Sequence, residues 1–166
     1  MKYIISVILT TFLFSCNTSS NSKSNTYFGG EIINPKSNIV LLLKNEKVID
    51  EILLDENNRF ISEYPSLEEG LYTFKHGNEF QYIYFEPADS ILIRLNTWDF
   101  DESIVFSGLG SSKNEFLINL FLQNEKEEKE MYNFLKLEEE YFEHKLNLLI
   151  SERNLMFEQF LETQSA

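Results

Sequence analysis

The sequence is short of cysteine, glycine, proline and positive charge. Its 166 residues include one cysteine, 6 glycines and 3 prolines. A single thiol can form neither an intramolecular disulfide nor a Cys-x-x-Cys redox pair, and it excludes a cysteine-rich zinc site. The low glycine and proline content excludes a collagen-like or low-complexity chain. We therefore expect an ordered domain that works without thiol chemistry.

Acidic residues outnumber basic ones, with 27 Asp and Glu against 14 Lys and Arg, which gives a net charge of −13. A field of that sign repels phosphate backbones, so we expect no nucleic-acid partner. The 43% hydrophobic content, with 15 Phe and 8 Tyr, supplies ample material for a core and excludes a wholly disordered chain. The length fits one ordinary domain with an appendage.

The N-terminus predicts export and attachment to a membrane. Met1-Lys2 precedes an apolar run at residues 3–14, which is the length of a signal-peptide core and too short for a transmembrane helix. The run ends at Ser15-Cys16, which resembles a bacterial lipobox, in which the cysteine thiol receives diacylglycerol. We therefore expect residues 1–15 to be a signal peptide and Cys16 to be the lipid attachment site. A plain secretory signal with an incidental cysteine is the alternative.

A polar segment follows the cysteine. Residues 17–26 (NTSSNSKSNT) contain no apolar side chain, so residues 16–26 are predicted to form a lipidated cysteine and flexible tether. In Bacteroidetes lipoproteins an acidic cluster after the cysteine resembles a surface-export signal, and none is present here. This favours a cell-envelope location on the periplasmic side of the outer membrane.

Residues 27–107 are predicted to form an antiparallel β domain. In one run every second position is apolar, which places Ile91, Ile93 and Leu95 on one face and Arg94 on the other. Turn signals separate the apolar runs, and the connections are too short for crossover helices. We expect seven or eight strands in a sandwich-like sheet, with runs at residues 39–43, 48–54, 60–64, 71–74, 80–85, 90–95 and 104–106.

Residues 111–164 are predicted to be helical, which makes the chain an α+β protein. Ser112 and Glu115 fit a capping box at the start of the first helix, and the charged residues 124–130 fit a turn or a solvated helix. Beyond them two apolar columns repeat every seven residues: Phe134, Tyr141, Leu148 and Leu155, and Leu135, Phe142, Leu149 and Met156.

The long apolar pattern from residue 127 to residue 161 leaves the arrangement of these helices open. A continuous helix of this length would extend about 50 Å at 1.5 Å per residue, beyond a small β domain. It must bend, pair with the preceding helix or find a partner. We favour an antiparallel hairpin within the chain, with a protein partner or self-association through the C-terminal helix as further outcomes. Truncation of a longer protein is also an expectation.

Few residues suggest chemistry. The two histidines are far apart: His76 is expected in a solvent-facing turn and His144 on the helix, so neither predicts a metal site. The acidic run at residues 138–140 has no calcium-loop spacing and fits a solvated face. The loop at residues 98–102 is expected to pack Trp98 and Phe100 beneath a sheet edge. We predict no catalytic residue, metal or cofactor.

Residues 27–122 resemble the N-terminal domain that precedes the redoxin domain in TlpA-like thiol–disulfide oxidoreductase lipoproteins of Bacteroidetes. The resemblance rests on six segments in order: residues 29–35 (GGEIINP), 71–77 (LYTFKHG), 86–91 (EPADSI), 94–103 (RLNTWDFDES), 106–108 (FSG) and 114–117 (NEFL). It implies that a thioredoxin-like domain with a Cys-x-x-Cys pair follows the helices, and this sequence contains no such pair. No catalytic residue of the family can therefore be assigned to this chain.

The sequence thus predicts a membrane-anchored envelope lipoprotein domain that is not an enzyme by itself. It would serve as the anchoring and positioning part, or a fragment, of an oxidoreductase. The alternative is an envelope lipoprotein that binds a ligand or peptide through an aromatic-rich sheet. The candidate surface for that role is Tyr82, Tyr84 and Trp98, with Phe80 beside them.

Overall fold

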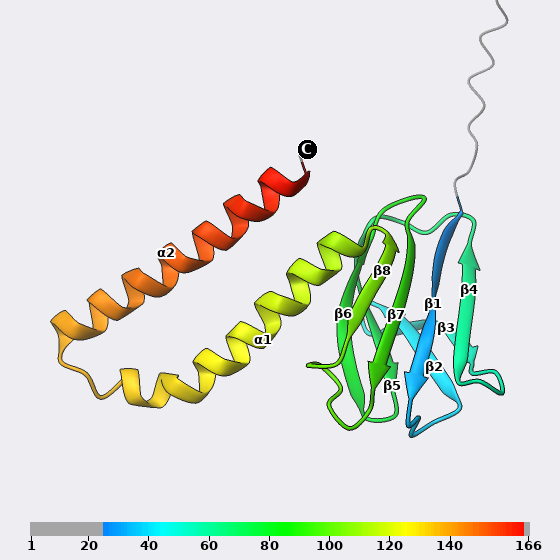
Figure 1. Ribbon diagram of the computed structural model, residues 1–166, viewed down its shortest axis with the longest axis horizontal. Helices are drawn as coiled ribbons and strands as arrows, with labels where there is room; N and C mark the ends of the chain where they lie inside the picture. Colours follow the sequence, from blue (N-terminus) through cyan, green and yellow to red (C-terminus); the bar gives the residue numbers. More distant parts are fainter. Residues whose placement is uncertain (1–24, 165–166) are drawn as a thin grey trace, which may run out of the picture.

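The computed structural model describes residues 25–164, which form two packed sheets and a helical hairpin (Figure 1). The first sheet has the strand order β4-β1-β7-β8 and the second has the order β3-β2-β5-β6. The α+β sandwich with a C-terminal helical region that the sequence predicts is confirmed. The elements are β1 (Thr26–Ile33), β2 (Ile39–Lys44), β3 (Lys47–Leu53), β4 (Arg59–Tyr64), β5 (Gly70–His76), β6 (Glu79–Phe85), β7 (Ser90–Asn96), β8 (Val105–Leu109), α1 (Ser111–Phe134) and α2 (Glu139–Gln164).

One strand pair departs from the antiparallel expectation. β1 and β7 run parallel, in a register that extends from Tyr27 opposite Ser90 to Ile33 opposite Asn96. The intervening chain visits the second sheet twice before it returns, so this parallel pair needs no crossover helix. The other pairs within the described residues are antiparallel.

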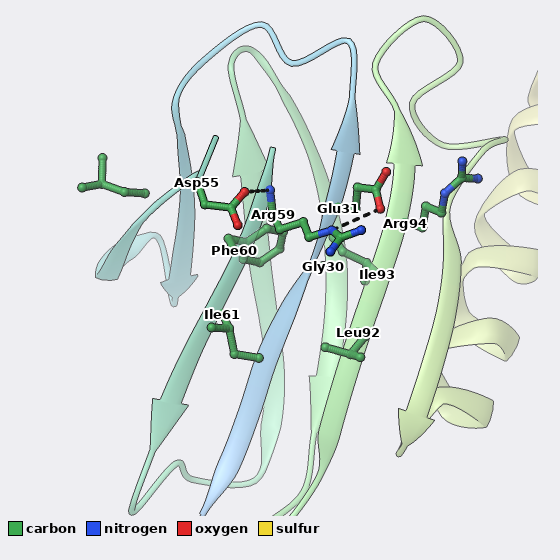
Figure 2. A pocket seen from close by; sticks show the side chains of 10 residues that line it. Gly30, Glu31, Asp55, Arg59, Phe60, Ile61, Leu92, Ile93 and Arg94 are labelled. Atoms are coloured by element: carbon green, nitrogen blue, oxygen red, sulfur yellow. Dashed lines mark hydrogen bonds and ion pairs between the residues drawn. The ribbon is translucent and has the colours of Figure 1, made fainter. Parts of the chain in front are cut away.

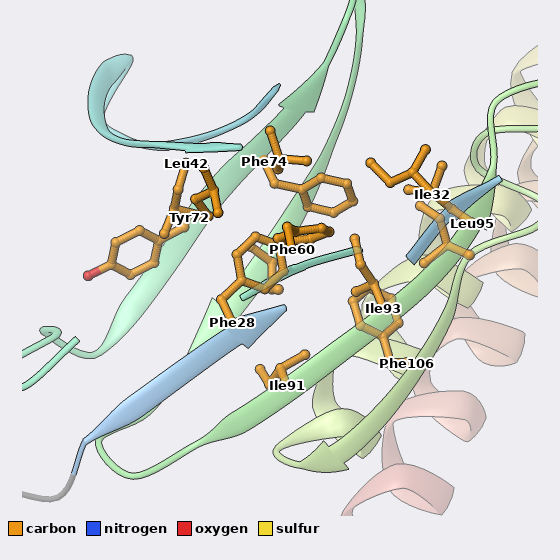
Figure 3. Close-up of a cluster of buried hydrophobic side chains, with 14 of the residues drawn as sticks. Phe28, Ile32, Leu42, Phe60, Tyr72, Phe74, Ile91, Ile93, Leu95 and Phe106 are labelled. Carbon is orange, nitrogen blue, oxygen red and sulfur yellow. The ribbon is translucent and has the colours of Figure 1, made fainter. Parts of the chain in front are cut away.

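The core lies between the sheets and centres on Phe28 of β1 (Figure 3). Its ring lies 5.1 Å from the ring of Phe60, 5.8 Å from that of Phe74 and 5.7 Å from that of Phe85. These distances are typical of edge-to-face and tilted aromatic packing. The predicted alternation in β7 is confirmed, because Ile91, Ile93 and Leu95 are buried while Leu92 and Arg94 are exposed.

Polar side chains join the two sheets along the side where β3 and β4 lie. The Asp50 carboxylate of β3 accepts hydrogen bonds from the Ser62 hydroxyl at 2.6 Å and the Tyr64 hydroxyl at 2.8 Å, both on β4. Burial, together with the Asp50 carboxylate, raises the pKa of Tyr64, so this phenol remains a donor. The Asp50 contacts therefore tie the two edge strands together.

Helix α1 covers the opposite side of the sandwich, where β6 and β8 lie, and Asn114 fixes it there. The Asn114 Oδ1 accepts a hydrogen bond of 2.7 Å from the Tyr84 backbone N–H, and its Nδ2 donates one of 2.9 Å to the Tyr84 carbonyl. The amide thus pairs with the edge strand β6 as a neighbouring strand would. Ile118, one turn later, is buried in the core.

The predicted capping box at Ser112 is wrong. Helix α1 begins one residue earlier, and its N-cap is Gly110 with φ of 94° and no side-chain cap. A Cβ at this position would lie 2.5 Å from Cγ of Asp89, so both the space and the left-handed conformation require glycine. Lys113 anchors the first turn instead, with its Nζ 2.9 Å from Glu86 and 3.1 Å from Asp89.

The antiparallel hairpin that the sequence favours is confirmed, and the apolar pattern over residues 127–161 is divided between two helices. The chain reverses at residues 135–138 between α1 and α2, while the charged residues 124–130 belong to α1. Helix α2 lies against α1 and away from the sheets (Figure 1). Pairing is the reason for the reversal, because it lets the Phe160 ring stack on the Phe116 ring at 4.5 Å. No helix within residues 25–164 has the length and apolarity to cross a bilayer.

We expect Asn114→Ala to lower the free energy of unfolding by about 2–4 kcal/mol, because it leaves both Tyr84 backbone groups without a partner. Urea denaturation followed by circular dichroism measures this change. Asn119→Ala, an exposed asparagine on the same helix, is the control and should change stability by less than about 0.5 kcal/mol. Equal effects of the two substitutions would contradict the role assigned to Asn114.

Candidate functional site

A groove of about 640 Å³ lies on the outer face of the first sheet (Figure 2). It runs across β4, β1 and β7, and the exposed side chains of Leu53, Ile61 and Leu92 line it. Ile61 is 62% exposed and Leu92 is 41% exposed. Apolar side chains this accessible, gathered in one concave place, are typical of a contact surface.

Two adjacent glycines of β1 lie beneath this groove. A Cβ at Gly29 would lie 2.6 Å from Cδ1 of Ile61 and 2.7 Å from the carbonyl oxygen of Phe60. A Cβ at Gly30 would lie 2.1 Å from the carbonyl oxygen of Ile93. Because neither residue has a side chain, the neighbouring strands approach closely and the centre of the sheet face stays open.

One end of the groove carries charge. Glu31 of β1 lies opposite Arg59 of β4 and opposite Arg94 of β7, so the three side chains form a row across the sheet. Arg59 Nε lies 3.6 Å from Glu31 Oε2, whereas the Arg94 guanidinium points away from that pair (Figure 2). Within residues 25–164 Arg94 makes no ion pair. The groove thus combines apolar walls with two guanidinium groups and the carboxylates of Glu31 and Asp55.

The predicted aromatic surface is divided by the structure. Phe80 and Tyr82 lie together on β6, with ring centroids 6.0 Å apart, and both are about half exposed. Tyr84 belongs to a polar contact, because its hydroxyl donates a 2.7 Å hydrogen bond to Glu69 and Lys113 lies over its ring. The Glu69 hydrogen bond raises the pKa of Tyr84 to about 12. Trp98 is in the loop that follows β7.

The expectation for the loop at residues 98–102 is half right. Phe100 is buried in the core, but Trp98 is 76% exposed and does not pack beneath the sheet. The loop is tied to β6 by Gln81, whose Nε2 donates a 3.0 Å hydrogen bond to Asp101. Burial raises the pKa of the Asp101 carboxyl. The Gln81 Oε1 also accepts a hydrogen bond from the backbone N–H of Tyr82. Gln81 therefore fixes the loop to β6 and satisfies a backbone donor at the edge of the sheet.

The solvent-facing position predicted for His76 is wrong. His76 is buried, because it is the last residue of β5 and its ring turns inward over the segment between β1 and β2. Its Nε2 accepts a 3.0 Å hydrogen bond from the Lys36 backbone N–H, so Nδ1 carries the proton and donates to the Ile39 carbonyl at 3.0 Å. Burial lowers the pKa of His76 below its usual value of 6.5. The ring therefore holds a loop in place.

The helical hairpin is the second candidate surface. Helix α2 has no buried residue, although it carries large apolar side chains at many positions. Of the two predicted columns, Tyr141, Leu148 and Leu155 are exposed, whereas Phe142, Leu149 and Met156 are partly buried. The acidic residues 138–140 and His144 are exposed. Within residues 25–164 no three metal-binding side chains are placed to share an ion.

The predicted ligand surface draws on more than one element, and the predicted lipid site is not among the residues that the structure describes. Tyr82 and Trp98 are on separate elements, and Cys16 lies outside the described residues. Sequence reasoning missed the groove. The alternation in β7 puts Leu92 and Arg94 on the outer face, but nothing in the sequence places β4 and β7 on either side of β1.

No protein-family model matches the chain, and no curated protein matches it. Among solved structures, a DUF3823 family protein from Bacteroides ovatus ATCC 8483 is similar at 11% identity and a TM-score of 0.33, over 43% of each chain. The major pilin subunit BcpA of Bacillus cereus is similar at 13% identity and a TM-score of 0.32, over 43% of this chain and 28% of the pilin. The chain spans less than half of either protein, and similarities this slight support no argument about function.

We expect the stability of the protein to fall as the pH drops below about 6.5, in part through His76. The folded pKa of His76 is below the unfolded value of 6.5, so the unfolded chain binds the proton first and stability is complete only above that pH. The contribution has a maximum slope of about 1.4 kcal/mol per pH unit.

The measurement is urea denaturation at pH 7.5 and pH 5.5. His76→Gln should reduce the difference in unfolding free energy between the two pH values, and His144→Gln, at an exposed position, should leave it unchanged. An identical pH difference in the wild type and in His76→Gln would show that the buried ring does not titrate as described.

Proposed function

We propose that the chain is a non-catalytic anchoring and positioning module of the cell envelope. A lipid on Cys16 holds it at a membrane, on the periplasmic side of the outer membrane, and the helical hairpin is presented to a protein. The observation that supports this best is helix α2, which exposes apolar side chains without a buried residue. A helix that is apolar on several sides is normally covered by protein.

The attachment of the hairpin suits a positioning role. Asn114, Lys113 and Ile118 fix the first two turns of α1 to the sandwich through hydrogen bonds, ion pairs and core packing. At 1.5 Å per residue the 24 residues of α1 extend about 36 Å. The hairpin is therefore a stiff arm that holds its apolar surface at a fixed distance from the sheets.

The resemblance to the domain that precedes a redoxin domain supports the same role. In that family the helices are followed by a thioredoxin-like domain, so the N-terminal part sets its distance from the membrane. Thiol–disulfide exchange needs an attacking thiolate and a resolving thiol. With its one cysteine assigned to lipid, this chain by itself carries out no such exchange.

We expect Cys16→Ser to move the protein from the membrane fraction to the aqueous fraction, because the substitution removes the only acceptor for diacylglycerol. Cell fractionation and intact-mass measurement of the membrane-extracted protein test this. Ser20→Ala, in the same polar segment, is the control and should remain membrane-bound. Wild-type protein without acyl mass in the aqueous fraction would disprove the anchoring role.

A second candidate function is ligand binding in the groove of the first sheet. The apolar walls at Leu53, Ile61 and Leu92 and the unpaired guanidinium of Arg94 favour an apolar chain that ends in a carboxylate. Such a ligand would replace water on the walls and supply the anion that Arg94 lacks. The sheet that would bind is the first, not the aromatic strand of the second.

We expect the Cys16→Ser protein to bind decanoate, and Arg94→Gln to raise the dissociation constant about tenfold, as the loss of a charge-assisted hydrogen bond does. Isothermal titration calorimetry measures both values. Lys75→Gln removes a cation from the second sheet and should leave the affinity unchanged. If methyl decanoate, which lacks the charge, binds as tightly as decanoate, Arg94 does not select the ligand.

A further inference from the structure

Helix α2 has a second apolar surface that α1 does not cover. The more buried column, Phe142, Leu149 and Met156, belongs to the side on which Phe160 and Arg153 contact α1. Tyr141, Leu148 and Leu155 each precede a member of that column by one residue. We call these three residues the outer stripe.

The geometry of the helix separates the outer stripe from the α1 contact by about 100°, the rotation of one residue. Tyr141 is 65% exposed and Leu155 is 56% exposed, so nothing within residues 25–164 covers them. A second helix can therefore lie along the outer stripe without displacing α1. Residues seven apart fall on nearly the same side of a helix, so the three side chains form one line along α2.

The charges beside the outer stripe identify the occupant. Lys145 and Glu152 border a concave surface of about 220 Å³ between α1 and α2, which Leu148 also lines, and neither makes an ion pair within the described residues. They are seven residues apart, so they lie on the same side of the stripe. The Lys145 Nζ lies 5.4 Å from the centre of the Phe134 ring, which holds it near the concave surface.

An antiparallel copy of α2 satisfies both charges at once. In an antiparallel pair, residues on one side of the first helix face residues on the same side of the second, and the two sequences run in opposite directions. Lys145 of each copy therefore faces Glu152 of the other, at two places related by the two-fold axis. In a parallel pair Lys145 and Glu152 would not face each other, because the same side of each helix would lie on opposite sides of the contact. The net charge of −13 disfavours an anionic membrane surface as the occupant.

We propose that the chain forms a two-fold symmetric dimer in which the outer stripes of two α2 helices pack antiparallel, with reciprocal Lys145–Glu152 ion pairs. This proposal rests on the proposed function, since it names a second copy as the protein that the hairpin meets. The arrangement is sterically open, because the C-terminal end of α2 lies beside the start of α1, next to the sandwich. An antiparallel pair therefore keeps the two sandwiches at opposite ends (Figure 1).

The experiment uses the mature chain from residue 16 with Cys16→Ser, which removes the lipid and leaves the hairpin unchanged. Sedimentation equilibrium should show a dimer for this protein. Lys145→Glu and Glu152→Lys should each raise the dimer dissociation constant about tenfold, because two attractive pairs become repulsive. The double variant K145E/E152K should restore the original dissociation constant.

A mixture of the two single variants gives the most specific test of the proposed ion pairs. Neither single variant pairs well with itself, but a one-to-one mixture of K145E and E152K should form a heterodimer. In that heterodimer, positions 145 and 152 carry opposite charges at both of the places where they meet. Glu143→Lys, at an exposed position on the far side of α2, is the matched control for charge and should not change the dimer. Circular dichroism of each variant excludes unfolding as the cause.

Leu148→Asp should abolish the dimer, whereas Ile150→Asp, on the other flank of α2, should not. A monomer at about 100 μM wild-type protein, failure of the double variant to restore pairing, or a dimer lost through Ile150 instead of Leu148 would each overturn the proposal. These outcomes leave the anchoring role intact, because that role fails only if Cys16 carries no lipid.

Discussion

The relation between the sheets and the hairpin depends on one side-chain amide. Asn114 closes two hydrogen bonds with the backbone of Tyr84, at the edge strand of the second sheet. It is buried, and it lies on the first turn of α1, so the same contact covers the strand edge and sets the direction in which the helix leaves. Without it, Lys113 and Ile118 would still hold the start of α1, but the helix would lose its two hydrogen bonds to the edge strand.

Much of the β domain could be predicted from local sequence patterns, whereas less of the helical region could be predicted in this way. Strand positions are set by alternation and by Asn- and Asp-rich turns, which act within a few residues. The parallel contact of β1 with β7 joins segments about sixty residues apart, so no local pattern contains it. The reversal at residues 135–138 has neither glycine nor proline, and only the packing of α2 on α1 accounts for it.

The candidate functional sites also differ in how much of each could be predicted from the sequence. Arg94 and Leu92 could be assigned to the outer face from the period of two, whereas the groove needs Ile61 of β4 across Gly29, which depends on the order of strands in the sheet. For His76 the local sequence gives a wrong prediction, because a histidine that precedes a glycine turn is expected to be exposed to solvent. His76 can be buried because Lys36 and Ile39, which are distant from it in the sequence, supply one hydrogen-bond donor and one acceptor to its ring.

The position of β1 has a mechanical consequence. The chain enters the sandwich at Thr26, the first residue of a strand that is hydrogen-bonded to β4 on one side and to β7 on the other. A pull on the preceding residues acts along the strand axis, so it must shear both ladders together instead of peeling bonds one at a time. Phe28 adds resistance, since it would have to slide out of the aromatic cluster. A pull applied ahead of Thr26 would therefore be resisted by two ladders at once.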